Sequence, residues 1–242
     1  MSSPHEAIAG RYESKLDKPE YVHSLFERGA PHYETIGKVG FFGTGHVYRR
    51  AALKRAGLEP GMKVIDVACG TGAVTRAAIE LVGKTGSVLG VDPNAGMMAE
   101  ARKYSDIEFK EGNAENLPAG DESFDFLSMG YALRHVDNLL DTFREYHRVL
   151  RPGGKICILE ITRPKSKVGL AFSKFYFRDL IPAVSKLVTG SEDAREMMVY
   201  YWETIDACVP PAEILEAIDA AGFRDVKRRA DLGIFSEYQA VK

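Results

Sequence analysis

The sequence has few cysteines, no excess of charge of either sign and no long apolar run. Its 242 residues contain three cysteines, which are too scattered for a disulfide framework or a metal site. Nowhere do about 18 apolar residues follow one another, so no membrane-spanning helix is expected. The first residues lack the basic and apolar regions of a signal peptide, and we therefore expect a cytoplasmic protein.

The charge balance excludes a further class of protein. Lysine and arginine number 32 and aspartate and glutamate 34, which gives a formal net charge of −2. A protein that grips nucleic acid over a broad surface needs a basic excess, so no nucleic-acid partner is expected. With 45% apolar and 27% charged residues, the chain has the composition of an ordinary globular protein.

From residue 62 onward, short apolar runs alternate with amphipathic segments, which is the pattern of a sheet covered by helices. Five strands are predicted in this part, at residues 64–68, 87–92, 107–111, 124–130 and 155–161. Two more strands, at residues 223–229 and 233–241, should be antiparallel neighbours because only a few residues separate them. The sequence therefore predicts an α/β fold.

The strongest local signal is a glycine turn between a strand and a helix. Asp66 is followed by Gly70, Thr71 and Gly72, and Asp92 ends the next strand 20 residues after Gly72. In such a crevice the glycines let the backbone approach a ligand, and an acid at the second strand tip accepts both hydroxyls of a ribose. The pattern predicts a nucleoside-containing ligand.

Two details separate the candidate nucleosides. Thr75 occupies the place of the third glycine of the dinucleotide fingerprint, where a β-branched residue hinders close contact between helix and strand. Asp66 lies close to the turn, where a carboxylate suits an ammonium group better than a pyrophosphate. These details favour a nucleoside that bears an amino acid, and a reductase that uses NAD is the weaker alternative.

Five segments resemble, in order, the motifs of Rossmann-like methyltransferases that use S-adenosylmethionine: VIDVACGTG, GVDPNAGMM, GNAENLP, SFDFLSMG and VLRPGGKICILE. They cover about residues 62–162. Within that superfamily, residues 130–136 and 191–222 are similar to the C-methyltransferases of ubiquinone and menaquinone biosynthesis. The resemblance implies a Rossmann-like sheet of seven strands, mostly parallel with an antiparallel last strand and with helices on both faces.

The resemblance also implies one methyltransferase domain over residues 1–242. Its parts would be a helical N-terminal cap (1–60), a cofactor-binding core (61–162), a helical lid inserted after the fifth strand (163–206) and a tail that completes the sheet (207–242). For S-adenosylmethionine it implies the binding residues Asp66, Gly70, Thr71, Gly72, Asp92, Pro93, Met97, Asn113, Ala114 and Gly130. Among these, Asp66 and the turn would surround the methionine moiety, Asp92 would hold the ribose, and Asn113 with Ala114 would read the adenine edge.

Methyl transfer to carbon needs alignment, exclusion of water and loss of a proton, and it needs no metal. A hydroxylated ring must gain phenolate or enolate character, and Arg134 could stabilise that oxyanion. His135 titrates near neutrality and is the candidate for proton removal, and Tyr33 is a further catalytic candidate. In the alternative structural role, Arg134 forms a salt bridge and His135 caps a helix.

Substrate choice is expected to lie in residues 1–60 and 163–206. Residues 163–186 are basic and interleaved with aromatic residues, which suits a lid over a hydrophobic acceptor, an interfacial helix or ordinary core packing. The acidic residues 191–206 should pack against them or pair with them across a homodimer, and a peripheral membrane contact through residues 163–188 is open. The residues expected to line the acceptor are His46, Tyr131, Phe175, Tyr176 and Tyr201.

Three functions remain open. The favoured one is S-adenosylmethionine-dependent methyl transfer to a small aromatic, quinone-like or phenol-like acceptor, with methylation on carbon. The second is a tailoring enzyme that methylates O, N or C of another small metabolite. The third is a nucleoside-binding protein without turnover, against which the intact Asp66, Asp92 and Asn113 argue.

Overall fold

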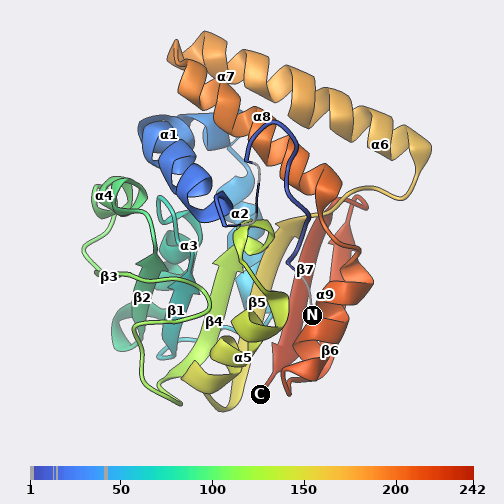
Figure 1. The fold of residues 1–242 in the computed structure, drawn as a ribbon. Coiled ribbons are helices and arrows are strands. Elements are labelled where there is room, and N and C mark those ends of the chain that lie inside the picture. The colour runs from blue at the N-terminus through green and yellow to red at the C-terminus, as the bar shows by residue number, and fades with distance from the viewer. Residues whose placement is uncertain (1–2, 13, 15, 41–42) are drawn as a thin grey trace.

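The computed structural model describes residues 3–12, 14, 16–40 and 43–242. A seven-stranded sheet runs through it in the order β3-β2-β1-β4-β5-β7-β6 (Figure 1). The strands are β1 (Lys63–Val67), β2 (Ser87–Asp92), β3 (Glu108–Glu111), β4 (Phe124–Gly130), β5 (Leu150–Ile161), β6 (Arg224–Asp231) and β7 (Phe235–Val241). Strands β1 to β5 are parallel and β7 is antiparallel to both its neighbours, which confirms the predicted α/β sheet and its antiparallel last strand.

Helices cover both faces of the sheet because successive side chains of each strand point to opposite sides. Ile65 and Leu127 belong to the core under α5 (Leu139–Val149) and α9 (Pro211–Ala220). Val64 and Phe126, one residue earlier in each strand, pack under α2 (Gly45–Arg55) and α3 (Ala73–Val82). The short helix α4 (Ala95–Arg102) follows β2, and the turns η1 (Gly83–Thr85) and η2 (Leu133–His135) precede β2 and follow β4.

Strand β5 begins earlier than the sequence predicts. The sequence predicts this strand at residues 155–161, yet it starts at Leu150 and includes residues 151–154. Gly153 keeps the left-handed φ of 81°, and the pairing of β4 with β5 shifts register between Phe124 and Phe126. A bulge of this kind accommodates a left-handed glycine within a strand.

The N-terminal cap and the insertion form a second layer above the carboxyl ends of the parallel strands (Figure 1). The cap contributes α1 (Lys18–Gly40), and the insertion contributes α6 (Lys167–Lys174), the π-helical segment η3 (Phe175–Leu180), α7 (Ile181–Thr189) and α8 (Glu192–Ala207). Leu25 and Ile36 of α1 share a core with Met197 and Trp202 of α8. Helices α7 and α8 pack together, and Lys186 pairs with Glu192 at their junction, as the opposed charges predict.

Candidate active site

Adjoining cavities lie under α1 at the carboxyl ends of β1 and β4. The first, the glycine-turn cavity, is lined by Asp66, the Gly70 turn and Gly130. The second, the aromatic cavity, lies between α1, α7 and α8, and both are open to solvent on one side. Tyr33, Arg49 and Tyr131 line both cavities, so the two spaces share a wall.

The backbone around the glycine-turn cavity is held in conformations that side chains disfavour. Gly70 and Gly72 have φ values of 53° and 79°. Ala68 and Tyr131, at the ends of β1 and β4, are also left-handed, with φ values of 51° and 63°. Such conformations cost energy in residues other than glycine and gather at ligand sites. Their position at two neighbouring strand ends points to this cavity as a binding site.

Asp66 is a buried carboxylate held by two hydroxyl groups. Thr75 Oγ1 donates to one of its oxygens at 2.5 Å and Ser128 Oγ to the other at 2.7 Å. Burial raises the pKa of Asp66 to about 6, although both hydrogen bonds act to lower it. Thr75, which stands in place of the third glycine of the dinucleotide fingerprint, therefore orients the Asp66 carboxylate.

Asp92 holds the turn in shape. Its carboxylate accepts hydrogen bonds from the backbone N–H of Gly70 at 2.8 Å and of Asn94 at 2.9 Å, and burial raises its pKa to about 6. Asp66 and Asp92 form no ion pair with a cation in the described part of the chain, and each oxygen keeps a lone pair for another donor. An ammonium group and ribose hydroxyls are such donors, so the donor set of S-adenosylmethionine fits these acids.

Helix α1 covers the glycine turn. Thr71 Oγ1 donates to Glu34 at 2.6 Å, and Arg76 pairs with the same carboxylate at 2.8 Å. Below the turn, Met97 Cε would lie 3.2 Å from a Cβ added at Gly70. Thr71 and Met97 thus surround the predicted cofactor site from the side of α1 and of α4.

The other predicted cofactor residues lie at the same edge of the sheet. Pro93 follows β2, and Asn113 and Ala114 follow β3, the strand that pairs with β2. These three do not belong to the lining of the glycine-turn cavity, whereas Gly130 does. A Cβ at Gly130 would lie 2.5 Å from Val74 Cγ2, so the packing of α3 on β4 requires glycine there.

The aromatic cavity is apolar apart from phenol groups and one cation. Tyr33, Tyr131 and Tyr201 line it, and burial raises the pKa of each of these phenols, which keeps them neutral. Its apolar walls come from α1, η3, α7 and α8, through Ile36, Phe177, Ile181 and Met198. The sequence predicted Tyr33, Tyr131 and Tyr201 for this region, and the structure brings all three together.

Arg49 of α2 is the residue that the sequence did not single out. It lines the glycine-turn cavity, the aromatic cavity and a third space beside Phe235. Its guanidinium carbon lies 5.3 Å from the centroid of the Tyr131 ring, and its buried Nε has no hydrogen-bond partner. Arg49 forms no ion pair with any carboxylate of the described residues. An unpaired cation at the junction of two cavities is suited to bind an anionic oxygen.

The predicted catalytic pair lies behind the aromatic cavity. Arg134, in η2, is fully buried, forms an ion pair with Glu160 and lies 4.5 Å from the centroid of the Tyr201 ring. His135 stacks on Tyr200 at 5.8 Å, and burial holds the pKa of its imidazole well below the usual range. Neither residue lines the cavity, so Arg134 reaches it only through Tyr201.

The remaining predicted acceptor residues lie outside the cavity. His46 is exposed on α2 and contacts Glu80 at 3.1 Å. Phe175 is 57% exposed on the outer face of η3. Tyr176 donates from its hydroxyl to the carbonyl of Gly40 and stacks on Phe172. The structure does not bring these three side chains to the residues of the aromatic cavity.

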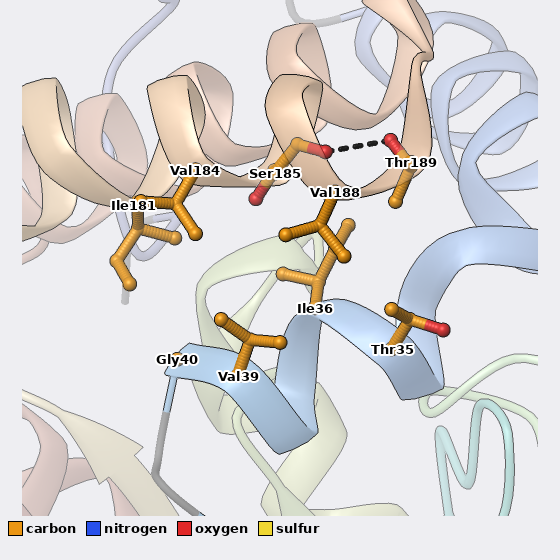
Figure 2. A pocket seen from close by; sticks show the side chains of 9 residues that line it. All are labelled: Thr35, Ile36, Val39, Gly40, Ile181, Val184, Ser185, Val188 and Thr189. Atoms are coloured by element: carbon orange, nitrogen blue, oxygen red, sulfur yellow. Dashed lines mark hydrogen bonds between the residues drawn. The ribbon is translucent and has the colours of Figure 1, made fainter.

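A groove, here called the outer groove, continues the aromatic cavity toward the surface between α1 and α7 (Figure 2). It shares Ile36, Gly40 and Ile181 with that cavity and extends to Val184 and Val188. Its walls are mainly aliphatic.

A strained glycine turn, two buried carboxylates and an adjoining aromatic cavity are the parts of a methyltransferase site. Residues 14–242 match the model of the ubiE/COQ5 methyltransferase family. The chain belongs to that family. The methyl donor of this methyltransferase is S-adenosylmethionine, as the sequence predicts, and its donor groups fit Asp66 and Asp92.

Relatives of this methyltransferase cover nearly the whole chain. A demethylmenaquinone methyltransferase from Geobacillus stearothermophilus is 34% identical over 88% of this chain and 92% of its own. A 2-phytyl-1,4-naphtoquinone methyltransferase from Thermosynechococcus vestitus is 33% identical over 88% of this chain and 94% of its own.

Solved structures confirm the fold of this methyltransferase. An S-adenosylmethionine-dependent methyltransferase from Thermotoga maritima, described as a possible histamine N-methyltransferase, superposes with a TM-score of 0.64 at 22% identity. The superposition covers 91% of this chain and 99% of that one. A second such enzyme, from Aquifex aeolicus, gives a TM-score of 0.61 at 19% identity over 86% and 97% of the two chains.

Proposed function

We propose that this methyltransferase methylates a ring carbon of a small quinol-like or phenol-like acceptor. The observation that carries the proposal is the position of Arg49 at the junction of the aromatic cavity with the glycine-turn cavity, without an ion pair to any described carboxylate. An acceptor ring fits walls of aromatic and aliphatic side chains, and its oxyanion fits the cation. The names of the relatives refer to quinones, which have an apolar ring system, and the reduced quinol form of a quinone carries acidic hydroxyl groups.

The cofactor would be held by groups whose geometry is already set. Asp66 would receive its ammonium group and Asp92 its ribose hydroxyls, with Thr71 and Met97 beside the turn. Asn113 and Ala114, at the end of β3, are proposed to contact the adenine edge of the cofactor, and Pro93 is proposed to contact the cofactor at the same end of the site. When bound, S-adenosylmethionine supplies an electrophilic methyl group and leaves as S-adenosylhomocysteine.

The protein's own contribution is to position and activate the acceptor. Arg49 would hold the ring oxygen in its anionic form, which raises the electron density at the neighbouring ring carbons. Tyr33 would donate a hydrogen bond, because its raised pKa keeps the phenol protonated. The apolar side chains of η3, α7 and α8 exclude water from the reacting carbon.

Arg134 and His135 take different places in this proposal. Arg134 would act as a positioning residue that fixes the ring of Tyr201 from below. Loss of the ring proton to His135 stays a prediction, since the imidazole does not line the cavity. His46, Phe175 and Tyr176 stay predictions as acceptor residues in the same way.

The decisive experiment supplies the enzyme with labelled S-adenosylmethionine and a panel of naphthoquinols, benzoquinols, simple phenols and amines. Methylated product from a quinol, with the label on a ring carbon by mass spectrometry and NMR, supports the proposal. Label on oxygen or nitrogen in every product would reject it in favour of the tailoring enzyme. Binding of S-adenosylhomocysteine with no transfer to any acceptor would favour the protein without turnover.

Other associations are proposed on weaker grounds. A small-molecule acceptor follows from the family, while a homodimer, a peripheral membrane contact through residues 163–188 and a cytoplasmic location remain predictions. None of the helices in the described residues is long and apolar enough to cross a membrane. Light scattering of the purified enzyme tests the dimer, and cell fractionation tests the location.

A further inference from the structure

The outer face of the rod formed by α6, η3 and α7 is apolar and uncovered (Figure 1). Six of the eleven large apolar side chains that are exposed in the described part of the chain lie between residues 168 and 188. Val168, Phe172 and Phe175 are 82, 62 and 57% exposed, and their spacing of four and three residues places them on one helix face. Gathered apolar exposure of this kind marks a contact surface.

Unpaired lysines flank this face. Lys165, Lys167 and Lys174 have no carboxylate within 4 Å among the described residues. By contrast, Arg163 pairs with Asp206 at 2.8 Å and Arg178 with Asp179 at 2.8 Å. The face therefore keeps positive charge although the whole chain has a net charge of −2.

The charge decides between two occupants of the face. An anionic bilayer attracts lysines at its surface and accepts aromatic and aliphatic side chains below them. A second copy bound through a twofold axis would bring the unpaired lysines of both copies into one interface, and an excess of like charge at an interface opposes association. The combination of exposed phenylalanines and unpaired lysines therefore favours a lipid surface.

The outer groove opens between α1 and α7, at the α7 end of the rod, and its side chains from α7 point toward α1 (Figure 2). Its outer end is formed by Val188, which is 51% exposed, and its inner end by Ile36 and Ile181, which also line the aromatic cavity. Near the outer end, Thr189 donates its hydroxyl to the carbonyl of Ser185 at 2.6 Å, which satisfies the polar group within α7. The walls along the groove are thus mainly apolar.

We infer that the outer face of α6, η3 and α7 docks on an anionic membrane surface, from which the outer groove admits an apolar acceptor. The docking depends only on residues of the insertion. The path of the acceptor rests on the proposed function, because it assumes an apolar substrate in the aromatic cavity.

The test is flotation of the full-length enzyme with vesicles of phosphatidylcholine, with and without about 30% phosphatidylglycerol. We expect binding to the anionic vesicles and little to the neutral ones. Replacing Lys165, Lys167 and Lys174 by Gln should weaken vesicle binding roughly 100-fold, since each lysine near such a surface contributes about tenfold or less. The double variant V168S/F172S, which changes two exposed side chains of the same face, should weaken it roughly tenfold or more.

A charge-matched control carries Gln at Lys54, Lys84 and Lys227, which are exposed on other elements. This control should bind vesicles like the wild type. Equal binding by the lysine variants of both sets, or no binding by the wild type, would overturn the docking. A fall in molar mass from dimer to monomer in V168S/F172S would assign the face to a second copy instead.

The activity assay separates docking from the proposed function. With a short, water-soluble quinol, the triple lysine variant and V168S/F172S should methylate at the wild-type rate, because the changed side chains line neither cavity. With an acceptor held in anionic vesicles, the same variants should lose most of their activity. Absence of transfer by all proteins on both acceptors, with intact vesicle binding, would reject the proposed function and leave the docking in place.

Discussion

The reactive properties of this site arise from charged side chains that lack a counter-charge. Among the described residues, Asp66 and Asp92 are buried without an ion-paired cation, and Arg49 has no ion-paired acid. Burying a charge without a counter-charge is costly, and a protein tolerates it where a ligand completes the interaction. The unmatched charges therefore locate the cofactor and the acceptor more sharply than the shape of the cavities does.

Replacing Arg49 by Gln should lower kcat/KM for a quinol roughly 10- to 100-fold, because one charged hydrogen bond to the oxyanion is lost. Steady-state kinetics measures the effect. The exposed neighbour Arg50, which contacts Glu80 at 3.4 Å, provides the matched control R50Q with near wild-type activity. R49K should recover part of the loss, whereas equal rates for R49Q and R50Q would remove Arg49 from the mechanism.

Binding of S-adenosylhomocysteine should weaken as the pH falls from about 7 to 5. The pKa of Asp92 is raised to about 6, so protonation in this range removes the anionic acceptor of the ribose hydroxyls. Isothermal titration at several pH values measures the change, and it should also detect proton release on binding near pH 6. Asp92→Ala should abolish measurable binding, and unchanged affinity in that variant would contradict the assignment.

At the scale of elements, the glycine turn works because α3 approaches β4 very closely. Gly130 has no room for a Cβ, since Val74 Cγ2 would lie 2.5 Å away, and Val74 is stiff because it is β-branched. The close approach keeps Val74 and Gly130 together in the wall of the glycine-turn cavity. The contact between Val74 and Gly130 therefore sets both the distance between α3 and β4 and the shape of the glycine-turn cavity.

Gly130→Ala should destabilise the fold by about 1 to 3 kcal/mol through overpacking against Val74. Urea unfolding of the free protein measures this difference. The substitution V74A makes room for the new methyl group, so adding G130A to V74A should destabilise the protein less than adding G130A to the wild type. Strictly additive effects of the two changes would show that this contact does not limit the packing.

The sequence predicted the elements well because both periodicities are clear in it. The strand 87–92, the strand 124–130 and the insertion helices were found close to their observed positions. The start of β5 was missed because Pro152 and Gly153 signal a turn. In the structure Leu150 pairs with Phe124, and Gly153 and Gly154 exchange backbone hydrogen bonds with Lys242. Local propensity cannot anticipate a bulge that long-range pairing stabilises.

The site was predicted where motifs fix it and missed where tertiary packing forms it. Asp66, Asp92 and the glycine turn are sequential motifs, so their common location follows from the topology. Arg49 carries no motif and enters the site because α2 packs beside β1 and β4. Its only sequence signal is a pair of arginines, Arg49 and Arg50, of which one faces the cavities and the other contacts an acid at the surface.

At the scale of the whole molecule, stability and ligand binding should be linked through the buried acids. Because burial raises the pKa of Asp66 and Asp92 to about 6, the folded state binds their protons more readily than the unfolded chain does. Their contribution to the free energy of unfolding is therefore greatest below pH about 4 and falls as the pH rises to about 6. Above that range both carboxylates are ionised, and the donor groups of the ligand must compensate for the cost of burying their charge.

Thermal unfolding with and without S-adenosylhomocysteine tests this linkage. At a ligand concentration about 100 times Kd, the gain is about 2.7 kcal/mol, which corresponds to roughly 5 to 10 °C in Tm for a chain of this size. At equal ligand concentration the shift should be larger at pH 7 than at pH 5, because the carboxylates are ionised at pH 7. A shift that is independent of pH would argue against their role in binding.

The wall shared by the two cavities also couples their occupants. Tyr33, Arg49 and Tyr131 contact both spaces, so ordering these side chains around one ligand lowers the entropic cost of binding the other. Thermodynamic reciprocity requires that each ligand raise the affinity for the other by the same factor. The enzyme would then bind S-adenosylhomocysteine most tightly while the methylated product is still bound. Release of the product would therefore be the step that allows S-adenosylhomocysteine to dissociate and a new turnover to begin.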